Sequence, residues 1–148
     1  MVSLYTLQVF LIEGLITEEF GDQEISRIIQ IRGDQTLEEL HHAIFHAYNR
    51  WDEHMYEFNL GTDPYDDSAR YVLPGMPGGK GILGLVTNTT IDQLGLDKDR
   101  SFGYWFDFGD NWLHQINVVS IEDAPRSGKF PRTTKRVGKS PPQYPDFD

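Results

Sequence analysis

Two aspartates, a histidine and a run of aromatic residues lie within the segment YWFDFGDNWLHQI, residues 104–116. A carboxylate that faces an imidazole can act as a general acid–base pair, so Asp107 or Asp110 together with His114 could support hydrolysis. The tripeptide DFG, which begins at Asp107, also carries the magnesium-binding aspartate of protein kinases. A kinase needs an H-R-D catalytic loop, and the chain has none, so the DFG match is coincidental.

The turn between the two flanking segments decides whether these groups can meet. Apolar residues alternate on both sides of residues 109–111, which predicts a β-hairpin. A three-residue turn places Phe106 opposite His114, makes one face almost wholly apolar and puts Asp107 on the other face. A two-residue turn at Asp110 instead places Asp107 directly opposite His114. The alternation favours the three-residue turn, so we expect His114 in the core and Asp110 bonded to turn amides.

Two further histidines, His42 and His46, stand four residues apart on a predicted helix, a spacing that lets two imidazoles share one ion. The sequence shows no third ligand at a suitable spacing and no H-E-x-x-H motif. The glycine-rich segment 74–81 lacks the first glycine and the hydroxyl residue of a Walker A phosphate loop. We therefore expect no metal ion and no other cofactor.

A binding module needs only an exposed groove or sheet edge, and the hairpin offers aromatic and charged side chains for one. The candidate binding residues are Tyr104, Trp105, Asp107, Asp110, Trp112 and His114. The expected partner is a protein or a small-molecule ligand whose identity the sequence does not reveal.

The composition is that of one soluble globular domain. Of the 148 residues, 39% are hydrophobic and 13% are aromatic, which is enough to build a packed core. No cysteine is present, so disulfides and thiolate chemistry are excluded. The start of the chain lacks the basic residues of a secretory signal, and no segment is long enough to span a membrane. We expect a cytoplasmic protein.

Charge is distributed unevenly along the chain, whose net charge is -10. Residues 1–123 hold seven Lys and Arg against 21 Asp and Glu, a net charge of -14, whereas residues 124–148 hold six against two, a net charge of +4. We predict a single domain over residues 1–123 and a proline-rich basic tail over residues 124–148 that packs on it. The acidic body repels phosphate backbones, so nucleic acid is not its expected partner.

Periodicity and capping signals place the elements that position the hairpin. Thr36 and Glu39 form a capping box, which starts a helix from about Leu37 to Trp51. Alternating apolar residues predict strands near residues 3–13, 24–32, 54–60, 71–73, 102–108 and 112–121. This order predicts an α+β fold of the β-grasp (ubiquitin-like) type, in which one main helix crosses a mixed sheet that a C-terminal hairpin strand extends. Trp51, Phe106 and Trp112 are expected in its core.

These patterns also resemble those of a known family. The apolar first strand, the segment 37–58, the run QLGL at 93–96 and above all the signature DFGD-x-W-x-H at 107–114 are similar to the plasmid pRiA Orf-three-like family, also labelled insertion-element passenger TnpR-like. The closing segment, which contains PPQ at 141–143, is similar to the P-P-E ending of that family. The resemblance implies an association with mobile elements. It does not imply recombination, because no serine-recombinase pattern is present.

The sequence favours a small cytosolic binding module, for a protein or a small ligand, over an enzyme. One alternative is a metal-dependent or acid–base hydrolase that uses His114 with Asp107 or Asp110. The other alternative is a mobile-element-associated nucleic-acid accessory protein that uses the basic tail.

Overall fold

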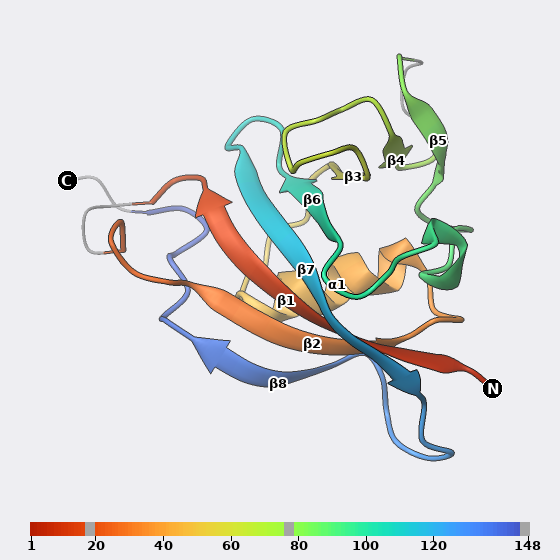
Figure 1. The fold of residues 1–148 in the computed structure, drawn as a ribbon. Helices are drawn as coiled ribbons and strands as arrows, with labels where there is room; N and C mark the ends of the chain where they lie inside the picture. Colours follow the sequence, from red (N-terminus) through yellow and green to blue (C-terminus); the bar gives the residue numbers. More distant parts are fainter. Residues whose placement is uncertain (17–19, 76–78, 146–148) are drawn as a thin grey trace.

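The computed structural model describes residues 1–16, 20–75 and 79–145, and its strands form one mixed sheet (Figure 1). The strands are β1 (Ser3–Glu13), β2 (Ser26–Arg32), β3 (Tyr56–Asn59), β4 (Arg70–Val72), β5 (Ile82–Leu85), β6 (Ser101–Phe106), β7 (Trp112–Asp123) and β8 (Arg132–Val137). The helices are α1 (Leu37–Ala47) and the short 3-10 helix η1 (Asp92–Leu94). Within the described residues the sheet order is β5-β4-β3-β6-β7-β1-β2-β8, and neighbours are antiparallel except β4 and β5.

Helix α1 begins at the predicted cap and ends before the predicted residue. The Thr36 side chain accepts from the Glu39 N–H, and the Glu39 carboxylate accepts from the Thr36 N–H, so the predicted capping box is confirmed. Asn49 adopts a left-handed conformation, with φ of 55°, and turns the chain out of the helix. Trp51 therefore lies beyond the helix and is 71% exposed, so its predicted place in the core is wrong.

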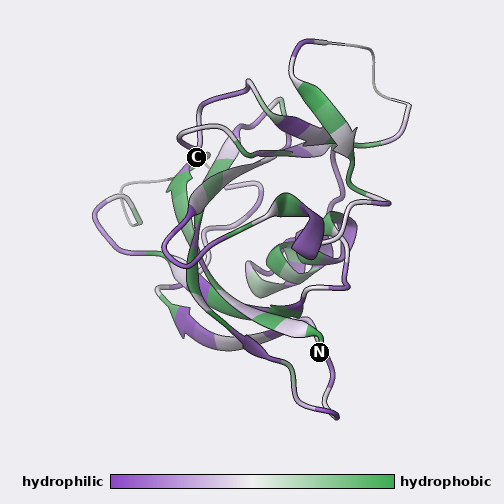
Figure 2. Cartoon of the chain, turned by 45° about the vertical axis from the view of Figure 1, so that its right-hand side comes forward, coloured by the Kyte–Doolittle hydropathy of each residue, from purple (hydrophilic) through white to green (hydrophobic). Residues whose placement is uncertain are grey.

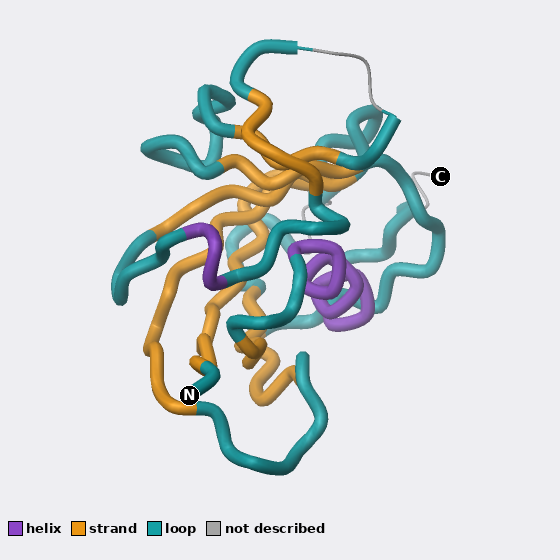
Figure 3. The backbone as a smooth tube through the Cα atoms, turned by 90° about the vertical axis from the view of Figure 1, so that its right-hand side faces the viewer, coloured by secondary structure: helices purple, strands orange, loops and turns teal. Residues whose placement is uncertain are grey.

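The sheet curves around α1 (Figures 2 and 3). Buried residues of both form one hydrophobic core. Successive side chains of a strand point to opposite faces, so one face of β3, β6 and β7 is turned toward the helix. The buried aromatic residues of these strands are Tyr56, Phe58, Phe102, Tyr104, Phe106 and Trp112. Leu40 and Ile44 of α1 are fully buried as well. The opposite face of the same strands, turned away from α1, is called the outer face below.

The hairpin between β6 and β7 keeps the predicted faces but not the predicted register. Phe106 pairs with Trp112, whereas the three-residue turn predicted Phe106 opposite His114. The turn runs from Asp107 to Asn111, and both of these non-glycine residues have positive φ, of 63° and 55°. The register is shifted by two positions, so each side chain stays on its predicted face, and His114 is buried in the core as expected.

The fold is α+β, mostly sheet, with one main helix. The β-grasp assignment is not confirmed, because β1 lies inside the sheet with antiparallel neighbours on both sides, β2 and β7. Two edge strands, β5 and β8, are absent from the elements that the sequence predicts. Within the part of the chain that the structure describes, no helix is long and apolar enough to cross a membrane.

Candidate functional site

The loop between β3 and β4 folds back over the outer face of the sheet. Pro64 lies so close to β6 that a Cβ on Gly103 would come within 2.7 Å of the Pro64 carbonyl oxygen. Position 103 therefore requires glycine, which lets the loop cover the polar side chains of β3. Glu57 and Asn59 are only 1% and 4% exposed. Glu57 is paired, because Arg70 donates to its two carboxylate oxygens at 3.0 and 3.1 Å.

Short-range hydrogen bonds hold this loop in shape. Asp66 accepts from the N–H and the hydroxyl of Thr62 and from the N–H of Ser68. These bonds favour the charged carboxylate and hold the pKa of Asp66 below its usual value. Tyr65 is thereby presented beside the end of β1, where its hydroxyl donates to Glu13 Oε2 at 3.1 Å.

A pocket of about 330 Å³ lies between this loop and the β6–β7 hairpin, and it is called the outer-face pocket below. The residues that line it include Glu13, Asn59, Tyr65, Asp67, Trp105 and Asn111. Trp105 is half-buried, and its indole N–H donates to Asn111 Oδ1 at 2.9 Å, which fixes the ring beside the pocket. The pocket thus combines two aromatic rings with two carboxylates.

Asn59, one of the residues that line the outer-face pocket, carries a buried acceptor without a hydrogen bond in the part of the chain that the structure describes. Within the described residues, Oδ1 of Asn59 has no partner, although the atom is buried. An unpaired buried acceptor costs about 1–3 kcal/mol, so most buried acceptors in proteins are paired. A ligand donor that reached this oxygen, through a rotation of the Asn59 amide, would remove this cost.

Three of the predicted binding residues of the hairpin face the core instead of this pocket. Tyr104, Trp112 and His114 are 1%, 1% and 0% exposed. His114 Nδ1 contacts the Tyr104 carbonyl oxygen at 3.1 Å, and Nε2 contacts Arg50 at 2.8 Å. Arginine has no acceptor atom, so His114 is neutral and carries its proton on Nδ1. Burial lowers the pKa of His114 well below its usual value, and the charge of Arg50 lowers it further.

The two aspartates of the hairpin do not form an acid–base pair with His114. Asp107 shapes the turn, because its Oδ1 accepts from the N–H groups of Gly109 and Asp110 at 3.1 and 3.3 Å. This amide-binding role was expected of Asp110, whose pKa is instead raised by burial and by the charge of Asp107. Asp107 Oδ2 lies 3.7 Å from His54 Nε2. The side-chain contacts of His114 in the described residues include no carboxylate.

A second polar cluster lies where α1 faces β6. His41 is fully buried, and its Nδ1 is 2.5 Å from the Tyr104 hydroxyl oxygen. Its Nε2 is 3.0 and 3.1 Å from the two carboxylate oxygens of Glu53. Burial raises the pKa of Tyr104, so the hydroxyl donates to Nδ1, and Nε2–H donates to Glu53. Burial also lowers the pKa of His41 to about 3, so the ring is neutral at neutral pH.

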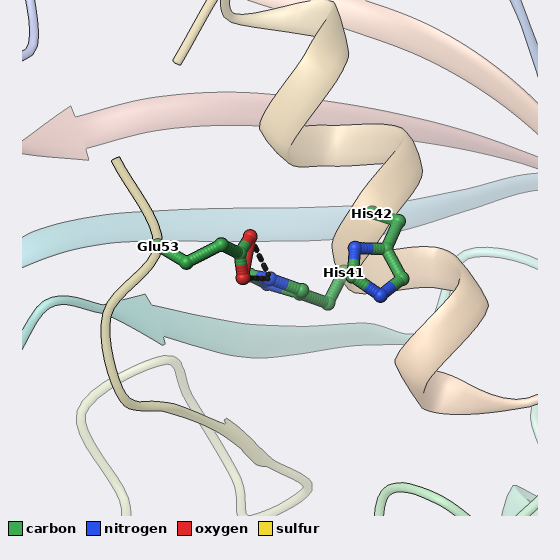
Figure 4. A group of neighbouring side chains, drawn as sticks. All are labelled: His41, His42 and Glu53. Atoms are coloured by element: carbon green, nitrogen blue, oxygen red, sulfur yellow. Dashed lines mark hydrogen bonds and ion pairs between the residues drawn. The ribbon is translucent and has the colours of Figure 1, made fainter. Parts of the chain in front are cut away.

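His42 completes a group of three possible metal ligands with His41 and Glu53. One ligand atom of each residue lies within 4.8 Å of the other two. The two histidines leave consecutive positions of α1, and Glu53 approaches from the segment that leads to β3 (Figure 4). The sequence instead suggested His42 with His46, and these two line a separate pocket between α1 and β8.

Several residues of both clusters carry little signal in the sequence. Asn59 and Glu57 lie on one face of β3, and they alternate with the aromatic residues of the other face. This alternation is the sequence signal that could have identified Asn59. Tyr65 and Glu13 meet only because the loop folds back, and no local pattern predicts that contact. Glu53 has no periodic relation to the histidines of α1, so the third ligand was missed.

Comparisons with known proteins identify a family from the sequence and a similar fold among solved structures. A family model described as Plasmid pRiA4b ORF-3-like protein matches residues 15–144. The structure is similar to the crystal structure of a protein of unknown function, MM3350 from Methanosarcina mazei Go1, with a TM-score of 0.77 and 21% sequence identity. That similarity covers 97% of this chain and 74% of the other, and at this identity it shows the fold alone. No curated protein matches the sequence.

Proposed function

The chain belongs to the plasmid pRiA4b ORF-3-like protein family, and we propose that it is a binding module whose outer-face pocket takes an organic cation. The group that enters the pocket is an alkylammonium or a guanidinium. The buried Oδ1 of Asn59, which has no partner within the described residues, carries the proposal. An N–H donor of the ligand supplies the missing hydrogen bond, and a hydrogen bond to a charged donor contributes about 1.5–3 kcal/mol.

The charges around the pocket favour a cation over an anion. Glu13 and Asp67 both line it, and its described lining residues include no lysine or arginine. The surrounding body is acidic as well, with a net charge of -14 over residues 1–123. An acidic surface concentrates cations and speeds their association, while it repels phosphate groups.

The aromatic residues of the pocket suit the same class of ligand. Trp105 and Tyr65 both line it, and a cation over the face of such a ring gains about 0.5–2 kcal/mol. The hydrogen bond from Trp105 to Asn111 holds the indole in place before any ligand binds. A ring that is already ordered loses less entropy on binding.

Isothermal titration calorimetry with two probes tests this function. Agmatine presents a free guanidinium group, and the peptide acetyl-Gly-Arg-Gly-amide presents the same group as the side chain of a protein. We expect one-to-one binding of at least one probe, and added salt should weaken it. The probe that binds more tightly indicates whether the natural ligand is a small molecule or an arginine side chain of a protein. The same weak heats for both probes and for glutarate, an anion of similar size, would reject the proposal.

Three variants distinguish binding in the outer-face pocket from nonspecific attraction to the acidic surface. Asn59→Leu removes the unpaired acceptor at similar size, and Glu13→Gln removes one carboxylate. Each should weaken binding about tenfold or more. Glu122→Gln is the matched control, because Glu122 pairs with Leu4 at the far end of β1, whereas Glu13 pairs near the hairpin. Equal losses in all three variants would indicate nonspecific attraction.

A further inference from the structure

We propose that His41, His42 and Glu53 bind a divalent transition-metal ion of the zinc type. Two imidazole nitrogens and one carboxylate oxygen form a ligand set that zinc takes in proteins, with water in the fourth position. The three ligand atoms lie within 4.8 Å of one another. The site lies between α1 and the segment before β3, so it does not depend on the outer-face pocket.

The separations are close to those that a tetrahedral ion needs. Metal–ligand bonds of about 2.0–2.2 Å place the ligand atoms about 3.4 Å apart. His41 Nε2 is already 3.0 and 3.1 Å from the oxygens of Glu53. The longest separation in the group therefore involves His42, whose exposed side chain has room to change its rotamer when an ion binds.

His41 is oriented in advance as a ligand. Its ring stacks on Tyr56, with 3.7 Å between the ring centroids, and its Nδ1 contacts the Tyr104 hydroxyl. A partner on the second ring nitrogen holds a metal-bound histidine in place. An ion on Nε2 requires the tautomer with the ring proton on Nδ1. Nδ1–H then donates a hydrogen bond to the Tyr104 oxygen, and the hydroxyl hydrogen turns away. The neutral ring needs to lose no net proton.

Solvent reaches the remaining coordination positions. Glu53 and His42 are both exposed, in contrast to the fully buried His41. An ion held by these three residues therefore keeps water as a further ligand, as open zinc sites do. The expectation of no metal rested on the lack of a third ligand in the sequence, and Glu53 supplies that ligand.

Calorimetric titration with zinc chloride, after dialysis of the full chain against a chelator, tests the site. We expect one zinc per chain. Glu53→Gln should weaken binding by more than about 100-fold, because the loss of an outer partner alone costs about 10–100-fold. His46→Ala should leave binding unchanged. His46 is exposed, and the amide oxygen of Gln can still accept from His41 Nε2–H, so neither change threatens folding.

The alternative ligand pair gives the opposite result. If His46→Ala loses zinc while Glu53→Gln keeps it, the ion belongs to the His42–His46 pair, and the proposal is overturned. Equal losses in both variants, or no stoichiometric zinc in the unchanged chain, overturn it too. Cobalt gives a second readout, since the strong visible absorption of a tetrahedral ion should appear in the unchanged chain and in His46→Ala but not in Glu53→Gln.

Discussion

At the scale of single residues, a buried arginine at the centre of the molecule has no ion pair with a carboxylate of the described residues. Arg50 is 6% exposed, and it donates to the neutral His114. Its guanidinium lies 4.9, 5.2 and 5.3 Å from the ring centroids of Tyr48, Phe106 and Trp112. Burial lowers the pKa of Arg50 to about 10, so it stays charged at neutral pH. The aromatic faces therefore act in place of a counter-ion.

The hydroxyls of two buried tyrosines should differ in their contribution to stability. Tyr104→Phe leaves Nδ1 of the buried His41 unpaired, so it should lower the free energy of unfolding by about 1–3 kcal/mol. Tyr56→Phe should cost less than about 0.5 kcal/mol, because the Tyr56 hydroxyl has no partner within the described residues. Urea denaturation of both variants measures the difference. A larger loss in Tyr56→Phe would contradict the hydrogen-bond assignment.

The buried histidines predict a pH dependence of stability. The folded-state pKa values of His41, about 3, and of His114, well below its usual value, lie under the unfolded value of about 6.5. Below about pH 6.5 the unfolded chain binds more protons, so the free energy of unfolding falls as the pH falls. The slope is up to about 1.4 kcal/mol per pH unit for each histidine, and it vanishes above that range.

Urea denaturation between about pH 7.5 and 5 measures this slope. His41→Gln should remove about half of it, and His46→Gln, at an exposed position, should leave it unchanged. An unchanged slope in His41→Gln would show that His41 is protonated in the folded protein.

At the scale of elements, local signals predict where structure begins better than how elements pair. The capping box of Thr36 marks the start of α1, and alternation marks both strands of the hairpin. The hairpin register is not predictable, because Asp107 also adopts a left-handed conformation, which usually requires glycine, and so lengthens the turn. Strand β8 has no apolar alternation, and its pairing with β2 makes it a strand.

The same limit applies to the candidate sites. Trp105, one of the predicted binding residues, lines the outer-face pocket, whereas its neighbours Tyr104 and Phe106 are buried in the core. Its binding role stays a prediction. Tertiary packing positions both Asn59 and Glu53. The β3–β4 loop covers Asn59, and the turn of the chain after α1 brings Glu53 to His41. Contacts of this kind leave no periodic trace in a single sequence.

Two glycines of the hairpin should respond differently to alanine. Gly103→Ala brings a Cβ within 2.7 Å of the Pro64 carbonyl, so it should push the loop off β6 and cost about 1–3 kcal/mol. Gly109→Ala meets only Asp107 Oδ1, at 3.4 Å, and should cost much less. Thermal denaturation measures the stability of both variants. Agmatine binding should be lost in Gly103→Ala and kept in Gly109→Ala. Equal melting temperatures would show that the loop does not pack on β6.

At the scale of the whole molecule, the C-terminal segment joins parts that are distant in the sequence. Strand β8 covers the edge of β2. Arg27, 2% exposed, donates to the Val137 carbonyl and the Ser140 hydroxyl. The Gln143 side chain accepts from the Trp51 N–H and so holds the segment that follows α1 against the C-terminal segment. The stability of the acidic body is therefore expected to depend on this basic segment.

Ending the chain after Asp123 should lower the free energy of unfolding by at least about 3 kcal/mol, because the buried Arg27 loses two hydrogen bonds of about 1.5–3 kcal/mol each. It also exposes the edge of β2, which favours aggregation. A chain that ends after Pro145 keeps all of these contacts and is the control. If the two chains melt alike in urea, the C-terminal segment does not stabilise the domain.

Whether an organic cation occupies the outer-face pocket is measured most directly by nuclear magnetic resonance of the labelled protein during an agmatine titration. The chain has three tryptophans, so it gives three indole N–H signals. Only Trp105 lines the pocket, whereas Trp51 lies beyond α1 and Trp112 lies in the core. We predict a saturable shift of the Trp105 signal and of the Asn59 side-chain amide, with the other two indole signals unchanged. No saturable shift at Trp105, or an equal shift at Trp51, would contradict the proposed function.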